Sequence, residues 1–378
     1  MDQVYTDSLE LHKKFHGKLE VRSKVPLANR VDLSLAYTPG VAEVSRVIGK
    51  DPSLAREYTI KRNTVAVVSD GSAILGLGNL GPHAAMPVME GKAILFKEFA
   101  DVDAFPICLD TQDTEEIIKT VKYLAPTFGG INLEDISAPR CFEIEERLKK
   151  ELDIPVMHDD QHGTAVVVLA ALINAAKLKK LDKAEAKIVI SGAGAAGTAV
   201  AKMLIGYGFK KVFVCDSKGL IHENRKDLNS AKLALAKLSG APGVDMGLKE
   251  IIKGADVFIG VSGPNILSRE EIKTMNREPV VFALANPVPE IMPEEAKAGG
   301  AFIVASGRSD FPNQINNVLA FPGIFRGALD NGVREITDRM LTKAAENLAN
   351  YVEQLSLENI LPKALDKGVV KVIAQAIM

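Results

Sequence analysis

Short apolar runs alternate with longer helical stretches through the second half of the chain. Five of these runs are bounded by Gly, Pro, Asn or Asp and have the length of buried strands: AKIVISG, KKVFVCD, ADVFIGVSG, PVVFALANP and AFIVASG. Strands that alternate with helices in this way are typical of a parallel sheet with crossover helices. The pattern predicts an α/β fold with a Rossmann-type, doubly wound parallel sheet over residues 161–378, closed by amphipathic helices near the C-terminus.

The first half of the chain is less regular and predicts a mixed α/β domain over residues 1–160. The segment TVAVVSDGSAILGLG is interpreted as a β-hairpin, because Asp70-Gly71 can supply the positive φ angles of a tight turn. INLED and DIPVMHDD are each interpreted as a strand that leads into a helix. The second of these helices, roughly Thr164 to Leu178, is long and apolar, and we expect it to connect the two domains.

The segment KIVISGAGAAG places Gly192, Gly194 and Gly197 between a predicted strand and a predicted helix. This is the context of the dinucleotide fingerprint, in which the three glycines allow a tight turn, a close approach of the backbone to a pyrophosphate, and close packing of helix on strand. Glycines that only punctuate a turn would not explain the strand, the helix and the acid at the end of the next strand. The predicted NAD(P) site consists of Gly192, Ala193, Gly194, Ala195, Ala196, Gly197 and Asp216.

The choice between the two nicotinamide cofactors depends on the end of that next strand. Asp216 can accept hydrogen bonds from the adenosine ribose, which favours NAD. The neighbouring Ser217 and Lys218 could instead meet the 2′-phosphate of NADP. The sequence therefore favours NAD only slightly.

Two acidic pairs, Glu134-Asp135 and Asp159-Asp160, each follow a predicted strand. Ligands of open α/β sheets gather at the carboxyl ends of the strands, so these carboxylates could converge there. So many like charges in one cleft require a cation, and a set of oxygen ligands favours Mg²⁺ or Mn²⁺ over zinc. The alternative is that all four carboxylates cap helices and face water.

Two other segments, YTPGVAE and MEGKAILF, each contain one group that can transfer a proton. Lys92 lies among apolar residues, where desolvation would lower its pKa toward the range of a general base; a solvated surface lysine is the alternative. Tyr37 would by itself be only a packed aromatic with a hydrogen-bonded hydroxyl. His158 and His162 lie near the acidic pairs, but the residues between them look like a strand end and a loop, so we expect a structural or supporting role.

Composition narrows the class of partner. Of the 378 residues, 47% are hydrophobic and 25% are charged, and the formal net charge is -2. This is enough apolar material for two packed cores, and there is no basic surface for nucleic acid or an anionic membrane. The first residues lack the apolar core of a secretory signal, and no run approaches the roughly 18 apolar residues of a spanning helix. We expect a cytoplasmic protein without nucleic acid or membrane partners.

Eight motifs carry a family resemblance: YTPGVAE, SDGSAILGLGNLG, PVMEGKAILF, GGINLEDI, HDDQHGTA, the GAGAAG loop, FALANP and NQINNVLAFPG. They resemble the malic enzyme family over nearly the whole chain, and FADVDAFPICL is similar to its compact prokaryotic branch. The resemblance implies an oxidoreductase that decarboxylates L-malate to pyruvate and CO₂, reduces NAD or NADP, requires Mg²⁺ or Mn²⁺, and forms a homodimer. One alternative is an oxaloacetate decarboxylase or malolactic-type lyase on the same fold. Another is a nucleotide-binding protein without catalytic activity.

The resemblance also implies roles for individual residues. Those of the reaction centre are Tyr37 as general acid, Lys92 as general base, Asp159 as the group that orients Lys92, and Glu134, Asp135 and Asp160 as metal ligands. Those that bind the substrate are Lys92, Asn286, Asn316 and Asn317. Ala73 stands where longer members of the family carry a malate-binding arginine. The sequence leaves open which group replaces that arginine, and whether Tyr37 acts in its own subunit or in a partner's site.

Overall fold

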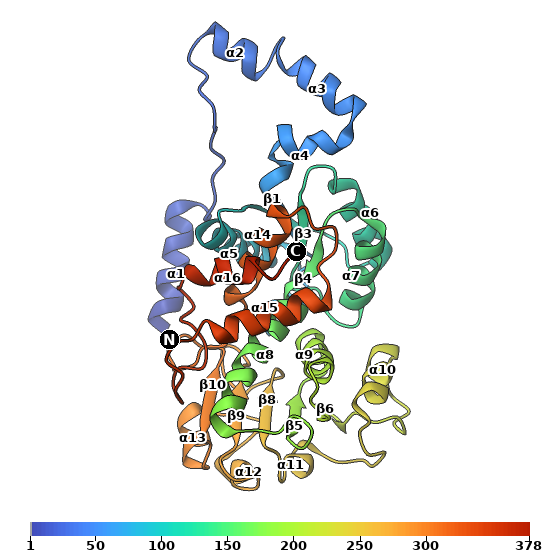
Figure 1. Ribbon diagram of the computed structural model, residues 1–378, viewed down its shortest axis with the longest axis vertical. Helices are drawn as coiled ribbons and strands as arrows, with labels where there is room; N and C mark the ends of the chain where they lie inside the picture. The colour runs from blue at the N-terminus through green and yellow to red at the C-terminus, as the bar shows by residue number, and fades with distance from the viewer. Residues whose placement is uncertain (1) are drawn as a thin grey trace.

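The computed structural model describes residues 2–378 as two β-sheets with their flanking helices, arranged one after the other along the long axis of the molecule (Figure 1). The first sheet has the strand order β2-β1-β3-β4, and the second has the order β10-β9-β8-β5-β6-β7. The strands are β1 (Thr64–Ser69), β2 (Asp103–Cys108), β3 (Gly130–Leu133), β4 (Val156–His158), β5 (Lys187–Ser191), β6 (Lys211–Asp216), β7 (Gly219–Leu220), β8 (Val257–Gly260), β9 (Val280–Ala283) and β10 (Ile303–Ser306).

Helices cover both sheets and form an arm beyond the first. The α-helices are α1 (Asp2–Phe15), α2 (Arg30–Ala36), α3 (Val41–Lys50), α4 (Ala55–Tyr58), α5 (Pro82–Ala100), α6 (Thr114–Leu124), α7 (Arg140–Glu151), α8 (Asp159–Lys179), α9 (Ala195–Gly206), α10 (Ser230–Ser239), α11 (Leu248–Ile251), α12 (Arg269–Lys273), α13 (Pro293–Ala298), α14 (Phe321–Asp330), α15 (Asp338–Asn350) and α16 (Gly368–Ala374). Three 3₁₀ turns are η1 (Pro52–Leu54), η2 (Ile60–Asn63) and η3 (Asn317–Leu319).

The second sheet confirms the Rossmann-type fold. All five strands expected from the apolar runs are present, and they pair in parallel with one another. Only the short β7 runs antiparallel, beside β6. Parallel strands with helices on both faces are buried on both sides, which explains why their sequences are continuously apolar rather than alternating.

The hairpin expected around Asp70-Gly71 is wrong. β1 pairs in parallel with β2 and β3, and after Ser69 the chain enters a loop instead of a returning strand. Asp70 is fully buried and forms an ion pair with Arg140 at 3.0 Å. Gly71 has the positive φ that was expected, but a Cβ there would lie 2.2 Å from the carbonyl oxygen of Gly81. The glycine therefore allows a close crossing of two loop segments.

The long apolar helix connects the two sheets as expected, but it begins earlier. α8 begins at Asp159, so the acidic pair and His162 lie in its first turn and not in a loop. Among residues 2–378, α8 is the one helix long and apolar enough to cross a membrane by length and composition alone. Because 72% of that window is buried inside the fold, α8 has the environment of a core helix.

The C-terminal helices return to the first sheet, beside α5 (Figure 1). Phe96 of α5 meets two rings of α14 edge-on, at centroid distances of 4.8 Å to Phe321 and 5.4 Å to Phe325. Such pairs contribute roughly 0.5–1.5 kcal/mol beyond their burial. This packing fixes α5 against a segment more than two hundred residues away, and α5 carries Lys92.

Candidate active site

The carboxyl ends of β3 and β4 bring the two acidic pairs together. β3 and β4 are parallel neighbours, with Leu133 opposite His158. The residues that follow these two positions are therefore adjacent at one edge of the sheet, as expected for ligand-binding residues of an open α/β sheet. Glu134 and Asp135 follow directly after β3. Asp159 and Asp160 are the first two residues of α8, where the helix dipole favours negative charge.

Three of these carboxylates form a compact cluster. Glu134, Asp135 and Asp160 each offer an oxygen within 4.8 Å of the others. Asp135 adopts a left-handed conformation, with φ at 53°, and its backbone N–H donates to Asp160 at 2.9 Å. Burial, and then the charge of Asp160, raise the pKa of Asp135 to about 8, and burial raises the pKa of Glu134 well above its usual range. One oxygen of Asp135 is buried without a hydrogen-bond partner.

The fourth carboxylate, Asp159, pairs with Lys92 instead. The Lys92 ammonium donates to Asp159, lies 3.1 Å from Glu134 Oε1, and sits 4.4 Å from the centroid of the Phe321 ring. Asn317 Nδ2 donates to the same oxygen of Asp159 at 2.7 Å. Asp159 therefore holds a lysine and an amide in fixed positions at the carboxylate cluster.

Burial lowers the pKa of Lys92 less than the neighbouring carboxylates raise it. Desolvation lowers its pKa, as the sequence predicted, but the charges of Asp159 and Glu134 raise it further, so the net pKa lies above the usual value. The expectation of a lowered pKa is therefore wrong for this arrangement of charges. An opposite charge within a few ångströms favours the ammonium form more strongly than burial disfavours it.

Gly163 leaves room for the carboxylate of Asp159. A Cβ at this position of α8 would lie 1.8 Å from Asp159 Oδ1 and 3.3 Å from Asn317 Cβ. Any side chain here would force the carboxylate away from Lys92. The glycine inside a helix is therefore explained by close packing, despite its unfavourable helix propensity.

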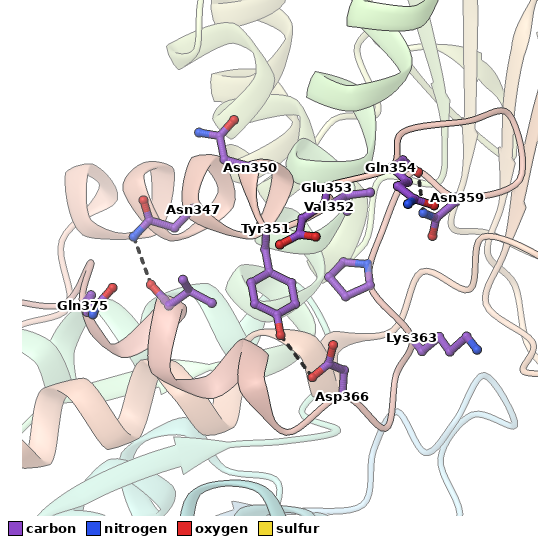
Figure 2. Close-up of a pocket in the computed structure, with 12 residues that line it drawn as sticks. Asn347, Asn350, Tyr351, Val352, Glu353, Gln354, Asn359, Lys363, Asp366 and Gln375 are labelled. Atoms are coloured by element: carbon purple, nitrogen blue, oxygen red, sulfur yellow. Dashed lines mark hydrogen bonds between the residues drawn. The ribbon is translucent and has the colours of Figure 1, made fainter.

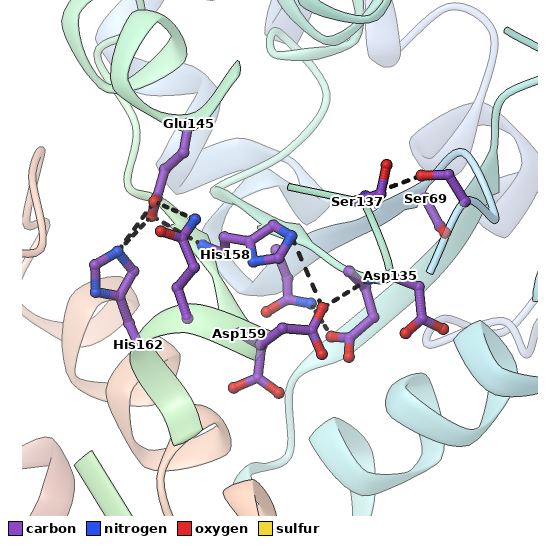
Figure 3. A network of polar contacts seen from close by, with 12 residues as sticks. Ser69, Asp135, Ser137, Glu145, His158, Asp159 and His162 are labelled. Atoms are coloured by element: carbon purple, nitrogen blue, oxygen red, sulfur yellow. Dashed lines mark hydrogen bonds and ion pairs between the residues drawn. The ribbon is translucent and has the colours of Figure 1, made fainter. Parts of the chain in front are cut away.

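Sequence reasoning missed Glu145, which supports the first turn of α8 from α7 (Figure 3). Its buried carboxylate accepts hydrogen bonds of 3.0 Å from the backbone N–H of His158, from Gln161 Nε2 and from His162 Nε2. Burial raises the pKa of Glu145, but the hydrogen bond and charge of His162, together with His158 and Lys149, lower it further, to about 2. Both histidines thus lie beside the cluster without joining the group of potential metal ligands among the described residues, in line with the supporting role expected.

The glycine-rich loop lies where β5 leads into α9. Gly192 has φ at 113°, and a Cβ there would meet the carbonyl oxygen of Val261 at 2.5 Å. A Cβ on Gly197 would lie 1.8 Å from the carbonyl oxygen of Gly192, whereas one on Gly194 would meet nothing within 4 Å. The first and last glycines are therefore required for packing, and the middle one borders open space, as a pyrophosphate site at a helix N-terminus requires.

A cavity of about 840 Å³ extends from this loop to Asp216 and Lys218 at the end of β6. Asp216 is not free: Arg225 contacts both of its oxygens, at 2.8 and 3.1 Å, and Lys232 donates to it at 2.6 Å. Burial raises the pKa of Asp216, but these two cations lower it below its usual value. A ribose hydroxyl would thus share this carboxylate with two cations.

A second cavity, of about 690 Å³, contains the reaction groups. Its lining includes the three clustered carboxylates, Lys92, Ala73, Ala196 and the expected substrate amides Asn286, Asn316 and Asn317. Ser262 and Gly263 border both cavities, so the nucleotide cavity adjoins the carboxylate cluster. Asn316 also caps η3 by accepting from the Val318 N–H at 2.9 Å. We call this second cavity the substrate cavity.

Tyr37, the predicted general acid, is not brought to this cavity by its own chain. It follows α2 in the N-terminal arm, residues 19–60, which projects from the body beyond the first sheet (Figure 1). Its side chain is 67% exposed, and it is absent from the cavity lining. Within one subunit, Tyr37 and Lys92 are therefore separated.

A cavity near the C-terminus has a polar lining, part of which is joined by hydrogen bonds (Figure 2). Tyr351 donates to Asp366 at 3.3 Å, Asn347 to the carbonyl of Val372 at 2.9 Å, and Asn359 to the carbonyl of Gln354 at 2.7 Å. The first two bonds join the end of α15 to the last segments of the chain, and the third closes the loop between them. We assign this cavity a structural role.

A Rossmann-type domain beside an acidic cluster with a buried lysine defines a dinucleotide-dependent oxidoreductase class. Residues 16–149 match the family description "Malic enzyme, N-terminal domain", and residues 161–377 match "Malic enzyme, NAD binding domain". The chain belongs to the malic enzyme family.

Individual relatives agree with this assignment. The chain is 54% identical to the bifunctional malic/malolactic enzyme of Bacillus subtilis over 98% of its own length and 91% of that protein. It is 57% identical to the NAD-dependent malic enzyme of Geobacillus stearothermophilus over 96% of its length and 76% of that protein. The crystal structure of an NAD-dependent malic enzyme from Thermotoga maritima superposes with a TM-score of 0.94 at 53% identity, covering 98% of both chains.

Proposed function

We propose that this chain oxidises and decarboxylates L-malate to pyruvate and CO₂ with reduction of NAD or NADP. The observation that carries the proposal is the position of the Lys92–Asp159 pair and three clustered carboxylates in one cavity that adjoins the glycine-rich loop. A dehydrogenase that only oxidised a hydroxyl group would not need this acidic cluster. Family membership and the relatives above support the same reaction.

The residues present fit a divalent cation. Three carboxylate oxygens lie within 4.8 Å of one another, and a buried oxygen of Asp135 has no partner. We propose that Glu134, Asp135 and Asp160 hold Mg²⁺ or Mn²⁺, which prefer such oxygen ligands. When bound, this ion supplies Lewis-acid polarisation of the substrate's oxygens during decarboxylation.

Lys92 is the proposed general base for the 2-hydroxyl proton, and Asp159 the group that orients it. Lys92 must release its own proton before it can act in this way. Since Glu134 contributes to the raised pKa of Lys92, engagement of Glu134 by a dication would lower that pKa toward the working range. Asn286 and Asn317, with Asn316 beside them, are proposed to bind a substrate carboxylate.

The proposed reaction is tested by following reduced nicotinamide in a mixture of purified protein, L-malate and Mn²⁺, with NAD and NADP compared. Pyruvate formed in step with reduced cofactor, and lost on adding a chelator, is the expected result. Lactate without reduced cofactor would instead favour the malolactic alternative, and oxaloacetate alone would contradict the decarboxylation. The comparison of cofactors also tests which charge the adenosine ribose meets. A preference for NAD would indicate a contact with the carboxylate of Asp216, and a preference for NADP a contact of its 2′-phosphate with Arg225 or Lys232.

Replacing Asp135 with Asn is expected to weaken Mn²⁺ binding by about a hundredfold or more, because even outer-shell partners of metal sites contribute ten- to hundredfold. The amide has nearly the same size, so the loop should keep its shape. Calorimetric titration with Mn²⁺ measures the effect directly, without turnover. Turnover should fall in parallel, whereas the affinity for NADH should not change.

Asp153→Asn is the matched control, since this carboxylate is exposed and lies between α7 and β4. It should leave Mn²⁺ affinity at the wild-type value. Equal Mn²⁺ affinity in Asp135→Asn and the wild type would show that the cluster is not the metal site.

We also propose a homodimer in which the N-terminal arm of each subunit reaches the partner's site. Neither α2 nor α3 buries a residue within its own chain, and Val21, Leu35 and Tyr37 are among the exposed apolar side chains of the arm. Exposed apolar side chains gathered along one segment of the chain are typical of an interface. A second copy is the occupant that would also supply Tyr37, the proposed proton donor to C3, to a cavity that lacks it. The cytoplasmic location expected from the sequence stays a prediction.

A further inference from the structure

The substrate cavity is lined by a cluster of three carboxylates, although its proposed substrate, malate, carries two negative charges itself. Glu134, Asp135 and Asp160 occupy one end, where a cation would take one carboxylate of malate. The amides Asn286 and Asn317 can donate to a substrate carboxylate but carry no charge, so the second carboxylate of malate still lacks a cation. Burying a carboxylate without an opposite charge would cost several kcal/mol. Ala73, which lines the same cavity, offers no charge.

Among the described residues that line this cavity, three can carry positive charge: His12, Lys18 and Lys92. Lys92 is already engaged by Asp159 and Glu134. The first two come from the N-terminal helix α1 and the turn after it, which lie alongside α5 (Figure 1). They are the cations left for a second carboxylate.

The local sequence fixes Lys18 against α5. Its backbone N–H donates to Glu90 Oε2 at 3.1 Å, and its ammonium donates to the Pro87 carbonyl at 2.7 Å. Gly17 has φ at 108°, and a Cβ there would lie 2.9 Å from Glu90 Oε1. A Cβ on Gly91 would lie 3.8 Å from the Lys18 ammonium, an ordinary contact distance, so the ammonium rests against this turn of α5.

The ammonium of Lys18 is incompletely paired. No carboxylate of residues 2–378 lies within ion-pair distance of it, and burial lowers its pKa more than Glu90 raises it. His12 is similar: Nδ1 lies 2.7 Å from the Ser8 carbonyl oxygen, while Nε2 is buried without a partner. The Lys18 ammonium therefore has N–H groups left to donate to an anion at the cavity, and the His12 ring, in its protonated form, can donate from Nε2 as well.

We propose that Lys18, with His12 beside it, binds the carboxylate of malate that lies away from the acidic cluster and so selects dicarboxylates over monocarboxylates. This inference rests on the proposed function. Because that carboxylate loses its charge when it leaves as CO₂, the contact stabilises bound substrate more than the transition state. Loss of Lys18 should therefore raise KM more than it lowers kcat.

The test compares L-malate with L-lactate, which has the same 2-hydroxy acid group but lacks the second carboxylate. Calorimetric titration in the presence of Mn²⁺ and NADH measures binding without turnover, since the cofactor is already reduced. Lys18→Ala should weaken L-malate binding by about 10- to 100-fold, the usual effect of losing one hydrogen bond to a charged group, and change L-lactate binding little. Lys18→Arg should retain most of the preference.

Lys13→Ala, which changes an exposed lysine of α1, is the control and should change neither affinity. Unchanged malate affinity in Lys18→Ala, or an equal loss for malate and lactate, would overturn the inference, the second result pointing to a structural role. A wild-type protein that neither binds nor oxidises L-malate would instead contradict the proposed function itself. The two failures are therefore distinguishable.

Discussion

Replacing Lys92 with Arg should lower kcat for malate oxidation by about a thousandfold, within the usual range for loss of a general base. Arg keeps the positive charge that Asp159 and Glu134 require, but its guanidinium stays protonated at any working pH. The variant should therefore fold and bind cofactor while losing the proton-transfer step. Initial rates with saturating malate, cofactor and Mn²⁺ measure the effect.

A second variant separates chemistry from stability. Lys92→Met removes the charge and leaves buried carboxylates without a cation, so the free energy of unfolding should fall by about 3–5 kcal/mol. Chemical denaturation should show this loss in Lys92→Met and much less of it in Lys92→Arg. Activity of Lys92→Arg within tenfold of the wild type would rule out Lys92 as the general base.

The sequence was sufficient to predict which residues meet at the sheet edge. Carboxyl ends of adjacent parallel strands must lie together, so acidic pairs directly after β3 and β4 had to converge once those strands were recognised. The same reasoning placed the glycine-rich loop after β5, and Asp216 at the end of β6. These predictions needed only the order of strands and the residues that follow them.

Residues that support the site from a distance could not be predicted. Glu145 shares a helix face with Cys141, Ile144 and Leu148, which is a signal that the sequence contained. Its partners on β4 and α8 could not be read from that period, because they come from the packing of α7 in the fold. Lys18 likewise appears in sequence as one of several lysines near the N-terminus. The raised pKa of Lys92 could not be predicted from its apolar neighbours in sequence either. It depends on Asp159, which is 67 residues away along the chain, and on Glu134, whose charges together outweigh the effect of burial.

The DG turn shows that a local signal can be correct while its structural consequence is not. Gly71 does adopt positive φ, yet the buried Asp70–Arg140 pair directs the chain into a loop that contacts Asp135. There the Ala73 N–H donates to the Asp135 carbonyl at 2.9 Å, which helps hold this residue in its left-handed conformation. A turn motif predicts a bend in the chain, whereas strand pairing is decided by what the following residues can pack against.

The N-terminal arm carries the proposed proton donor, Tyr37, outside the substrate cavity of its own chain. Tyr37 was expected to donate a proton, and it is exposed on an arm that extends away from the cavity (Figure 1). In a twofold dimer, an arm that leaves one subunit can enter the other, and the reverse exchange follows by symmetry. Each site would then combine Lys92 of one subunit with Tyr37 of its partner.

Tyr37→Phe should lower pyruvate formation by about 10²- to 10⁴-fold, because Phe retains the aromatic ring but cannot donate a proton. Co-expression with Lys92→Arg, using two different affinity tags to isolate heterodimers, distinguishes the two arrangements. If Tyr37 acts in the partner's site, one of two sites contains both wild-type groups, so about half of the wild-type activity should return. If Tyr37 acts in its own subunit, each site lacks one group and the heterodimer should be as inactive as its parents. Heterodimers carrying both substitutions on the same subunit are the control, since they should be inactive at both sites in the exchanged arrangement and half active if each site is built from one chain.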